Sequence, residues 1–542
     1  MKTVLISVNA KYIHTNNAVR LLKVNTDFPV DIMEYTIKDA IEKIVSDIEL
    51  VNPEVLGFSI YIWNISIITK IIDKLNLSNT KIIIGGPEVS YDSKYFLTEH
   101  NVDFIIRGEG EIAFNKLLHA FDLNTDFDSV PNLMYFKDGN LINKGITEIL
   151  DLDALKQPYF LEDDIIHIPN KISYIESSRG CPYKCSYCLS SLEKKVRFFS
   201  IENVKKTILY LMAYGSKTIK FLDRTFNANK NTLDLLSFII ENNNYKTVFQ
   251  FEITGDILDQ KIIDHLNEFA PKGLFRFEIG IQSINTETNL LVDRFQNTER
   301  LFNNIRLIQK GNIIDLHLDL IAGLPKEDLN SFKITFDEVF KLGAKELQLG
   351  FLKMLRGTKI RQQANVYNYL YNDIAPYEII SNDSLSEEDT KEIHLVEHML
   401  DIYHNKGYFK ENLLHYILST NSPFNFFKEI GEHYIKNQYS FKGYQIEDVY
   451  QRLFTFVKDD SIIYTFKKDY LRRSKIKPKI FWDNSIKKQE KRKVFEQLSI
   501  ENKVDINIFY KYSIIIKYET EYFVISYKNF NNYYYIVKDD IS

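Results

Sequence analysis

The sequence contains few cysteines: its 542 residues include three, all between positions 181 and 188. A secreted protein would be expected to carry spaced pairs, so one odd-numbered cluster predicts metal or redox chemistry in a reducing compartment. Long apolar runs are also lacking, because no stretch reaches the roughly 18 consecutive apolar residues of a membrane helix. The apolar run Val4 to Val8 is too short for the core of a signal peptide. We therefore expect a cytoplasmic protein without a membrane partner.

Neither sign of charge dominates, since 68 Lys and Arg stand against 73 Asp and Glu and give a net charge of −5. This balance gives no overall signature of nucleic-acid binding. One local run, residues 467–493, holds twelve Lys or Arg against three acids, with aromatic residues interleaved. Such a run could hold phosphates and stack bases, whereas most charge runs are solvated helix faces. RNA binding therefore stays open as an alternative role of the C-terminal region.

Residues 1–125 show apolar strands in alternation with helices, which predicts a doubly wound, Rossmann-like parallel sheet with right-handed connections. Such sheets bind ligands outside the carboxyl ends of their strands. The ends expected to line a site are residues 9–17, 59–64, 85–90 and 108–111. The pattern weakens over residues 126–169, where three prolines and acidic clusters predict a linker with a little strand.

A second series of strands and helices occupies residues 170–360, with six strands expected near 172–177, 218–223, 248–253, 274–279, 316–321 and 346–351. Six units of this kind predict a partial (β/α)6 barrel, an incomplete version of the eightfold barrel, with its chemistry on the loops after the strands. Residues 361–542 change character and predict a mostly helical α+β domain that ends in antiparallel strands. The overall fold class expected is α/β with this C-terminal extension.

The three cysteines lie in the segment Arg179-Gly-Cys181-Pro-Tyr-Lys-Cys185-Ser-Tyr-Cys188, directly after the first strand of the second series. Thiolate is the preferred ligand of iron-sulfur clusters, so three thiolates on one short loop predict a 4Fe-4S cluster with one iron left open. Zinc is a poorer match, because structural zinc takes four closed ligands and the chain has no fourth cysteine.

The cysteine spacing, with an aromatic residue before the last cysteine, resembles the cluster loop of the radical S-adenosylmethionine (SAM) superfamily. The resemblance implies that the open iron chelates SAM and that the reduced cluster cleaves SAM to a 5′-deoxyadenosyl radical. It also implies an electron donor such as flavodoxin or ferredoxin. The alternative for each polar residue at a strand end is a buried group satisfied within the barrel. The implied ligands are Cys181, Cys185 and Cys188 for the cluster and Tyr187, Asp223, Glu252, Gln282, Ser283 and Gly323 for SAM.

The N-terminal domain resembles the cobalamin-binding domains that precede many radical SAM cores. Their pattern is Asp-x-His-x-x-Gly in the first loop, then Ser-x-Leu, and Gly-Gly after a later strand. Here Tyr12 stands in the Asp position and Asn17 in the Gly position, so His14 lacks the carboxylate that orients a ligating imidazole. His14 is therefore either a cobalt ligand or a loop residue near the corrin. The cobalamin contacts that the resemblance implies are His14, Ser59, Gly85, Gly86 and Glu109.

Three cysteines suffice for one cluster, which excludes methylthiotransferases and other members with a second cluster. The resemblance then implies a cobalamin-dependent radical SAM enzyme that methylates an unactivated carbon, through methylcobalamin, in a small-molecule substrate. One alternative is a cobalamin-assisted radical rearrangement or oxidation without methyl transfer. The other is RNA-directed modification through the basic C-terminal segment.

Overall fold

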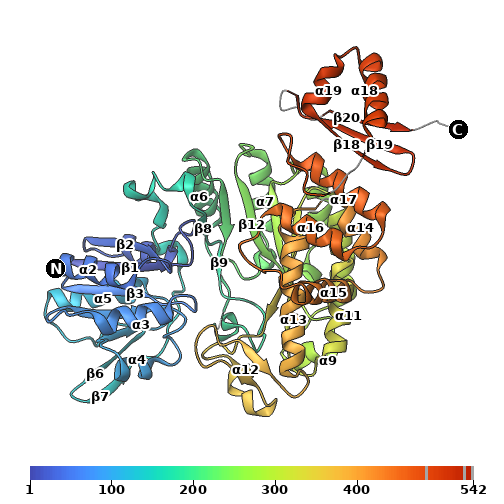
Figure 1. The fold of residues 1–542 in the computed structure, drawn as a ribbon. Coiled ribbons are helices and arrows are strands. Elements are labelled where there is room, and N and C mark those ends of the chain that lie inside the picture. The colour runs from blue at the N-terminus through green and yellow to red at the C-terminus, as the bar shows by residue number, and fades with distance from the viewer. Residues whose placement is uncertain (194, 410, 483–485, 529–532, 539–542) are drawn as a thin grey trace. The chain divides into compact units, whose positions relative to one another are not determined.

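A computed structural model describes every residue except 194, 410, 483–485, 529–532 and 539–542 (Figure 1). The chain divides into two compact units, and each is described here by itself. The first unit comprises Met1–Thr335, Leu342–Lys345 and Leu349–Thr390. The second unit comprises Phe336–Lys341, Glu346–Gln348 and Lys391–Ser542. Among the described helices, none is both long and apolar enough to cross a membrane.

The first unit opens with a seven-stranded sheet in the order β2-β1-β3-β4-β5-β6-β7 (Figure 1). Strands β1 to β5 pair in parallel, as the doubly wound fold requires. The little strand expected within residues 126–169 corresponds to β6 and β7, and β6 buries Leu133, Met134 and Tyr135 and adds an antiparallel hairpin to the sheet. The strands are β1 (Thr3–Asn9), β2 (Val30–Thr36), β3 (Val55–Ser59), β4 (Lys81–Gly85), β5 (Phe104–Ile106), β6 (Leu133–Lys137) and β7 (Asn140–Asn143).

Helices cover both faces of this sheet because successive residues of a buried strand point to opposite sides. Val4, Ile6 and Val8 of β1 join the core that α2, α3 and α4 cover, whereas Leu5 joins the core under α1 and α5. Both cores are built from Ile, Val, Leu and Phe, so the doubly wound fold class is confirmed. The helices are α1 (Asn17–Val24), α2 (Ile41–Val51), α3 (Ile65–Lys74), α4 (Ser93–Glu99) and α5 (Glu111–Asp122).

The same unit continues with a six-stranded sheet in the order β15-β14-β13-β12-β11-β8, which confirms the partial barrel. Within this sheet, β8, β11, β12, β13 and β14 pair in parallel with their neighbours. The strands are β8 (Ser173–Ile175), β11 (Thr218–Phe221), β12 (Val248–Ile253), β13 (Phe275–Gln282), β14 (Asp315–Ala322) and β15 (Glu346–Phe351). The helices are α6 (Ile201–Ala213), α7 (Thr232–Glu241), α8 (Gln260–Phe269), α9 (Thr286–Leu291), α10 (Thr298–Gly311), α11 (Leu329–Phe340) and α12 (Lys359–Gln362).

Two short pairings flank this barrel. Strands β9 (Ser178–Arg179) and β10 (Arg197–Phe198) are antiparallel and hold the two ends of the segment that contains the cysteines. Strands β16 (Leu370–Tyr371) and β17 (Ile379–Ser381) form a second small ribbon after the barrel. The sequence pattern did not indicate either pairing, because two- and three-residue strands have no detectable periodicity.

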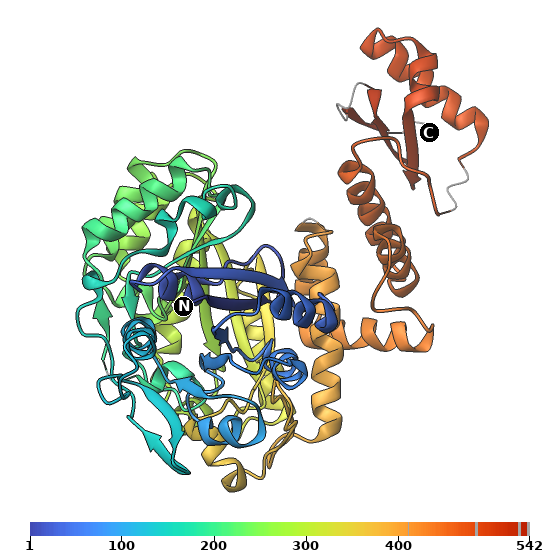
Figure 2. The ribbon, with the colours of Figure 1, turned by 90° about the vertical axis from the view of Figure 1, so that its left-hand side faces the viewer.

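The second unit is mostly helical and ends in the antiparallel sheet β18-β19-β20. Helices α18 and α19 cover one face of this sheet (Figures 1 and 2), with Phe495, Phe509 and Val524 in the shared core. Residues 483–485 of the basic run lie outside the described residues. The elements are α13 (Glu387–Leu400), α14 (Glu411–Ser419), α15 (Pro423–Lys436), α16 (Ile446–Phe456), α17 (Asp460–Arg473), α18 (Lys488–Asn502), α19 (Ile506–Tyr512), β18 (Ser513–Tyr518), β19 (Glu521–Ser526) and β20 (Tyr533–Lys538).

Candidate functional site

A cavity of about 500 Å³ lies at the carboxyl edge of the N-terminal sheet. Ser59, Gly85 and Gly86 line it at the ends of β3 and β4, as expected for a doubly wound fold. The segment after β9 closes the other side, with Arg179 and Gly180 in its wall. Because Gly180 directly precedes Cys181, the cavity and the cysteine loop share one wall.

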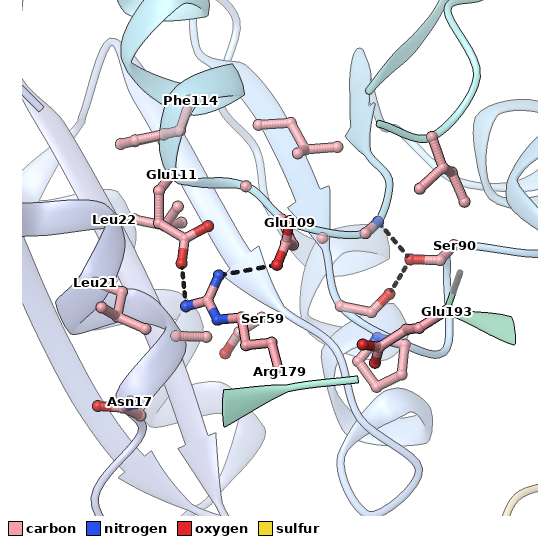
Figure 3. A pocket seen from close by; sticks show the side chains of 18 of the residues that line it. Asn17, Leu21, Leu22, Ser59, Ser90, Glu109, Glu111, Phe114, Arg179 and Glu193 are labelled. Carbon is pink, nitrogen blue, oxygen red and sulfur yellow. Dashed lines mark hydrogen bonds and ion pairs between the residues drawn. The ribbon is translucent and has the colours of Figure 1, made fainter. Parts of the chain in front are cut away.

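The depth of the cavity is apolar and narrow. Leu5 and Ile83 line it from the sheet. Leu22 of α1 and Phe114 of α5 line it from the helices (Figure 3). Gly57 also lines it and keeps it open, because a Cβ atom there would lie 2.5 Å from Cδ2 of Leu5. A slot with these walls suits a flat, largely apolar group such as the nucleotide base of cobalamin.

Two polar side chains that line the cavity can form hydrogen bonds with a ligand. The Ser59 hydroxyl accepts a hydrogen bond from Asn16 Nδ2 at 2.8 Å, so its own proton is available for donation into the cavity. The Asn17 Oδ1 atom is buried and has no hydrogen-bond partner among the described residues. A buried acceptor without a partner is costly, and an amide of a bound corrin would satisfy it. The cavity therefore fits cobalamin, and Asn17 is a contact that the sequence analysis missed.

Gly86 shapes the mouth of the cavity. Its φ of +115° is a conformation that residues with side chains rarely adopt, and an added Cβ would lie 2.3 Å from the Ile60 carbonyl oxygen. Gly85 is less constrained, since its added Cβ would lie 3.3 Å from the nearest atom, the Ile106 carbonyl oxygen. Both glycines stand where the resemblance placed them, with Gly86 as the stricter requirement.

Glu109 lines the cavity but is occupied by arginines, as Figure 3 shows for Arg179. Its carboxylate lies 3.1 Å from Arg179 Nη1 and 2.8 Å from Arg197 Nη1. Burial opposes ionisation, but the hydrogen bond from Arg197 and the nearby Arg179 charge hold the pKa of Glu109 below its usual value. Arg179 also pairs with Glu111 at 2.7 Å and with Glu176 at 2.9 Å. Glu109 thus lines the cavity as part of a cluster of ion pairs, and its contact with cobalamin stays a prediction.

His14 does not line the cavity. Its Nδ1 atom lies 2.6 Å from the hydroxyl of Tyr174, on the inward side of β8, and its backbone pairs with Ile172. Burial, followed by the charges of Lys11 and Lys220, lowers the pKa of His14 and favours neutral imidazole. The first loop therefore attaches the N-terminal domain to the barrel through His14, which is not among the residues that line the cavity.

The cysteine loop is a rigidly anchored turn after β9. Gly180 starts it with a φ of +94°, and a Cβ there would lie 2.3 Å from the Lys195 carbonyl oxygen. The backbone of Ser186 donates to the Val292 carbonyl at 2.9 Å and accepts from the Ile360 amide at 3.0 Å. The three cysteines are free of disulfides. The fold thus fixes the loop from three separate elements.

The donor set suits an iron-sulfur cluster. Among the described residues, no three His, Cys, Asp or Glu side chains are gathered closely enough to share one metal ion. Such spacing disfavours a mononuclear zinc site, whereas each iron of a cluster takes a separate thiolate. Burial raises the pKa of the Cys185 thiol, and the Arg294 guanidinium, 4.0 Å from its sulfur, opposes this rise. Arg294 and Thr225, which lies 3.5 Å from Cys181 Sγ, are further neighbours that the sequence analysis missed.

Three of the expected SAM contacts are structural. Asp223 is buried and accepts hydrogen bonds from Ser177 N, Ser177 Oγ and Ser178 Oγ at 2.9, 2.5 and 2.6 Å. Burial raises the pKa of Asp223 to about 6, against these hydrogen bonds. Its carboxylate therefore fixes the strand before the cysteine loop and does not face an ammonium group.

Ser283 and Gly323 are also turned away from a ligand. The Ser283 hydroxyl is buried and lies 2.5 Å from Glu327 Oε1. Gly323 is covered by β17, because an added Cβ would lie 1.8 Å from Ile379 Cδ1. Its carbonyl oxygen accepts from the Tyr369 hydroxyl at 2.9 Å. Contacts within the protein thus engage Asp223, Ser283 and Gly323, as the alternative of groups satisfied within the barrel predicts.

The other expected SAM contacts remain at the open side of the barrel. Tyr187 lies in the cysteine loop, with its hydroxyl 3.3 Å from Arg294 Nη1. Gln282 has a φ of +67°, and its Oε1 atom is buried with no hydrogen-bond partner among the described residues. Glu252 lies 3.8 Å from Arg224, a residue that also lines the cavity. These side chains leave donors and acceptors available next to the cluster loop.

Comparisons with known proteins agree with this geometry. Residues 4–118 match the family described as B12 binding domain, and residues 175–339 match the Radical SAM superfamily. The chain belongs to the cobalamin-binding radical SAM proteins. Residues 365–537 of this radical SAM protein match the family described as Protein of unknown function (DUF4080). The radical SAM domain implies a 4Fe-4S cluster and SAM as cofactors, cobalamin is the cofactor of the first domain, and the enzyme needs a reductant.

The curated relatives cover part of the chain. An uncharacterized methyltransferase of Pyrococcus horikoshii is 23% identical over 59% of this chain and 71% of its own length. The anaerobic magnesium-protoporphyrin IX monomethyl ester cyclase of Synechocystis is 28% identical over 44% of this chain and 49% of its own length. The cobalamin-dependent radical SAM methyltransferase TokK of Streptomyces tokunonensis is 22% identical over 55% and 46%. The chain thus spans about half the length of the last two.

Solved structures share the fold. The cobalamin-dependent S-adenosylmethionine radical enzyme OxsB, with aqua-cobalamin and S-adenosylmethionine bound, superposes with a TM-score of 0.60 at 14% identity and covers 93% of this chain and 81% of its own. The radical S-adenosylmethionine methyltransferase TsrM from Kitasatospora setae gives 0.57 at 17% identity over 68% and 78%. At these identities the likeness concerns the fold.

Proposed function

We propose that this radical SAM protein transfers a methyl group to an unactivated carbon of a small molecule. The observation that carries the proposal is the shared wall of the cavity. Ser59 and Gly86 of the first domain and Arg179 and Gly180 of the cysteine loop line one space. A corrin bound there would lie beside the cluster. Methyl transfer requires this proximity, because cobalamin carries the methyl group and the cluster generates the radical that activates the substrate.

Two relatives support methylation over other radical chemistry. The proteins from Pyrococcus horikoshii and Streptomyces tokunonensis are both called methyltransferases. The Synechocystis relative is called a cyclase, so rearrangement or cyclisation is the outcome against which methylation must be tested.

The residues of this chain have distinct tasks in the proposed reaction. Cys181, Cys185 and Cys188 would hold a cluster, which supplies the electron that cleaves SAM to a 5′-deoxyadenosyl radical. Tyr187, Glu252 and Gln282 are proposed to orient SAM from the loop and the strand ends. Ser59, Asn17 and the two glycines, Gly85 and Gly86, are proposed to hold cobalamin, which would carry a methyl group from one SAM molecule, released as S-adenosylhomocysteine, to the substrate.

The chain's own thiols set the conditions for this chemistry. An open cluster on three thiolates needs a reducing compartment, so we place the reaction in the cytoplasm with flavodoxin or ferredoxin as the reductant.

The test measures both products of SAM. The anaerobically reconstituted protein receives cobalamin, SAM and a low-potential reductant, and S-adenosylhomocysteine and 5′-deoxyadenosine are quantified by mass spectrometry. Methylation predicts both products, and Cys185→Ala is expected to abolish 5′-deoxyadenosine. Formation of 5′-deoxyadenosine alone, with no dependence on cobalamin, would contradict methyl transfer and favour rearrangement.

A further inference from the structure

One segment of the first unit contacts both loops that carry the cofactors. Residues 356–382 follow β15 and contain α12 and the ribbon of β16 and β17. From residue 365 onward they belong to the match with the family of unknown function. We call residues 356–382 the clasp. The proposed reaction gives this segment no task, so its contacts need an explanation of their own.

The clasp is fixed to the barrel at two points. The Tyr369 hydroxyl donates to the Gly323 carbonyl at 2.9 Å, at the end of β14. The Ile360 amide donates to the Ser186 carbonyl at 3.0 Å, and Ser186 directly follows Cys185. Ile360 and Ser186 are both buried, so water does not compete for this hydrogen bond. The second point therefore holds the cysteine loop itself.

The clasp also holds the loop after β4, which shapes the mouth of the cavity. The Tyr377 hydroxyl donates to Glu88 Oε2 at 2.8 Å and accepts from Arg356 Nε at 2.9 Å. Tyr377 and Glu88 are 1% and 2% exposed, and Glu88 comes two residues after Gly86. Burial raises the pKa of Glu88, and the Tyr377 hydroxyl and the Arg356 charge oppose this rise. Because a buried carboxylate is costly without such partners, this loop is stable where Tyr377 places it.

A second contact joins the clasp to the wall of the cavity. Gly357 has a φ of +88°, and an added Cβ would lie 2.4 Å from Cγ of Tyr91, so Tyr91 packs directly on the clasp backbone. Tyr91 lines the cavity. Gly357 comes three residues before Ile360, so the Cα atoms of these two contact points are at most about 11 Å apart. A short piece of chain thus connects the cavity wall to the cysteine loop.

We propose that the clasp sets the distance between cobalamin and the iron-sulfur cluster, and that Tyr377 is the positioning residue that holds the loop after β4 through Glu88. This gives the first residues of the family of unknown function a task at the enzyme's site. A misplacement on the order of 1 Å between reacting groups can cost about a hundredfold in rate, which is a functional reason for such a device. The inference goes beyond the proposed function, because it requires both cofactors but applies to methylation and to rearrangement alike.

The test measures the distance between the cofactors by electron paramagnetic resonance. Cob(II)alamin and the reduced cluster each carry an unpaired spin, and the cluster accelerates the spin relaxation of cob(II)alamin to a degree that falls steeply with distance. The reconstituted full-length protein is partly reduced without SAM, so that no turnover occurs. Tyr377→Phe keeps the buried ring and removes the hydroxyl. We expect it to weaken the relaxation effect about twofold, as a displacement on the order of 1 Å would at a separation of about 10 Å.

The matched control is Tyr35→Phe. Tyr35 is also a buried tyrosine of the first unit, and its hydroxyl donates to Asp47 Oδ2 at 3.0 Å. It packs in the core under α2 and is not among the residues that line the cavity, so the relaxation effect is expected to stay unchanged. Glu88→Gln keeps an oxygen that accepts from Tyr377 and is expected to retain the effect, whereas Glu88→Ala is expected to weaken it as Tyr377→Phe does.

Two results would overturn the proposal: an unchanged relaxation effect in Tyr377→Phe with both cofactors bound, or an equal loss in Tyr35→Phe. The spectrum of each cofactor alone is recorded in every variant, because a purely structural defect alters binding or stability but not the interaction between two bound cofactors. If Tyr377→Phe does not retain cobalamin, Gly357→Ala decides, since its Cβ displaces Tyr91, and an unchanged effect there would also overturn the proposal. Without SAM these spectra are independent of turnover, so a failure of methyl transfer is seen separately in the SAM products.

Discussion

Replacing Arg179 by methionine is expected to destabilise the first unit by about 3–5 kcal/mol, because removing one partner of a buried ion pair leaves the other charge uncompensated. Arg179 is 10% exposed and is the cation on both Glu111, at 2.7 Å, and Glu176, at 2.9 Å. Glu109 loses less, since it keeps Arg197 at 2.8 Å. The substitution therefore leaves the buried carboxylates of Glu111 and Glu176 without a cation, but not that of Glu109.

Tryptophan fluorescence during urea unfolding measures this loss of stability in the first unit. The chain has two tryptophans, Trp63 in the first unit and Trp482 in the second. A Trp482→Phe background therefore makes the signal specific for the first unit. The control Arg300→Met removes an exposed arginine of α10 and is expected to cost less than about 0.5 kcal/mol.

The pH dependence of the deficit tests its cause. Burial raises the pKa of Glu176 and the Arg179 charge opposes this rise, so Arg179→Met raises the folded pKa of Glu176 further above that of the unfolded chain. The folded variant then binds more protons than the unfolded variant, and its stability increases as the pH falls through the raised pKa values. The deficit relative to the wild type should therefore be smaller at pH 5 than at pH 8. A deficit below about 1 kcal/mol, or one that does not change with pH, would refute the role given to Arg179.

Two further variants test the other assignments. The pKa of Asp223 is raised from 3.8 to about 6, so its contribution to stability is lost as the pH rises through this range. The free energy of unfolding of Asp223→Asn is expected to increase relative to that of the wild type by up to about 3 kcal/mol between pH 4 and pH 8. A difference in urea unfolding that stays constant with pH would contradict the buried carboxylate. Gly86→Ala places a Cβ against the Ile60 carbonyl and is expected to weaken cobalamin binding more than tenfold in an absorbance titration, whereas Gly139→Ala, also at positive φ but with no atom within 4 Å, is expected to leave it unchanged. Equal affinities in the two glycine variants would remove Gly86 from the cavity mouth.

The cysteine loop and both sheets could be predicted because their signals are local. The spacing of Cys181, Cys185 and Cys188 is contained in eight residues, and the apolar strands stand out one at a time. The pairing of the edge strands β6 and β7 with the sheet was not predicted, because β7 has four residues, is exposed at both ends and is held by pairing with β6. A strand at a sheet edge owes its structure to its neighbour more than to its own composition.

Strand parity would have separated Asp223 from the other SAM candidates. Asp223 shares its parity with Ile219 and Phe221, which are buried under the helices, so parity predicts that its side chain points away from the barrel space. Parity does not place Gln282, because the register of β13 shifts between Gly280 and Gln282, where φ is +67°. The same alternation identifies Lys220 and Asp319 as inward residues. The information was present in the sequence, but it lies in the face of the strand and not in the position at its end.

Gly323 and Glu109 could not be assigned in this way, because distant segments decide their surroundings. Gly323 is covered by Ile379, which comes from the ribbon after the barrel. Glu109 is taken by Arg179 and Arg197, some 70 and 88 residues further along the chain. In both cases a residue type suited to a ligand is used to join two parts of the first unit. The ion pairs of Arg179 therefore have two consequences: they engage both acids of the Gly108-Glu-Gly-Glu111 turn, and they join the start of the cysteine loop to the wall of the cavity that would bind cobalamin.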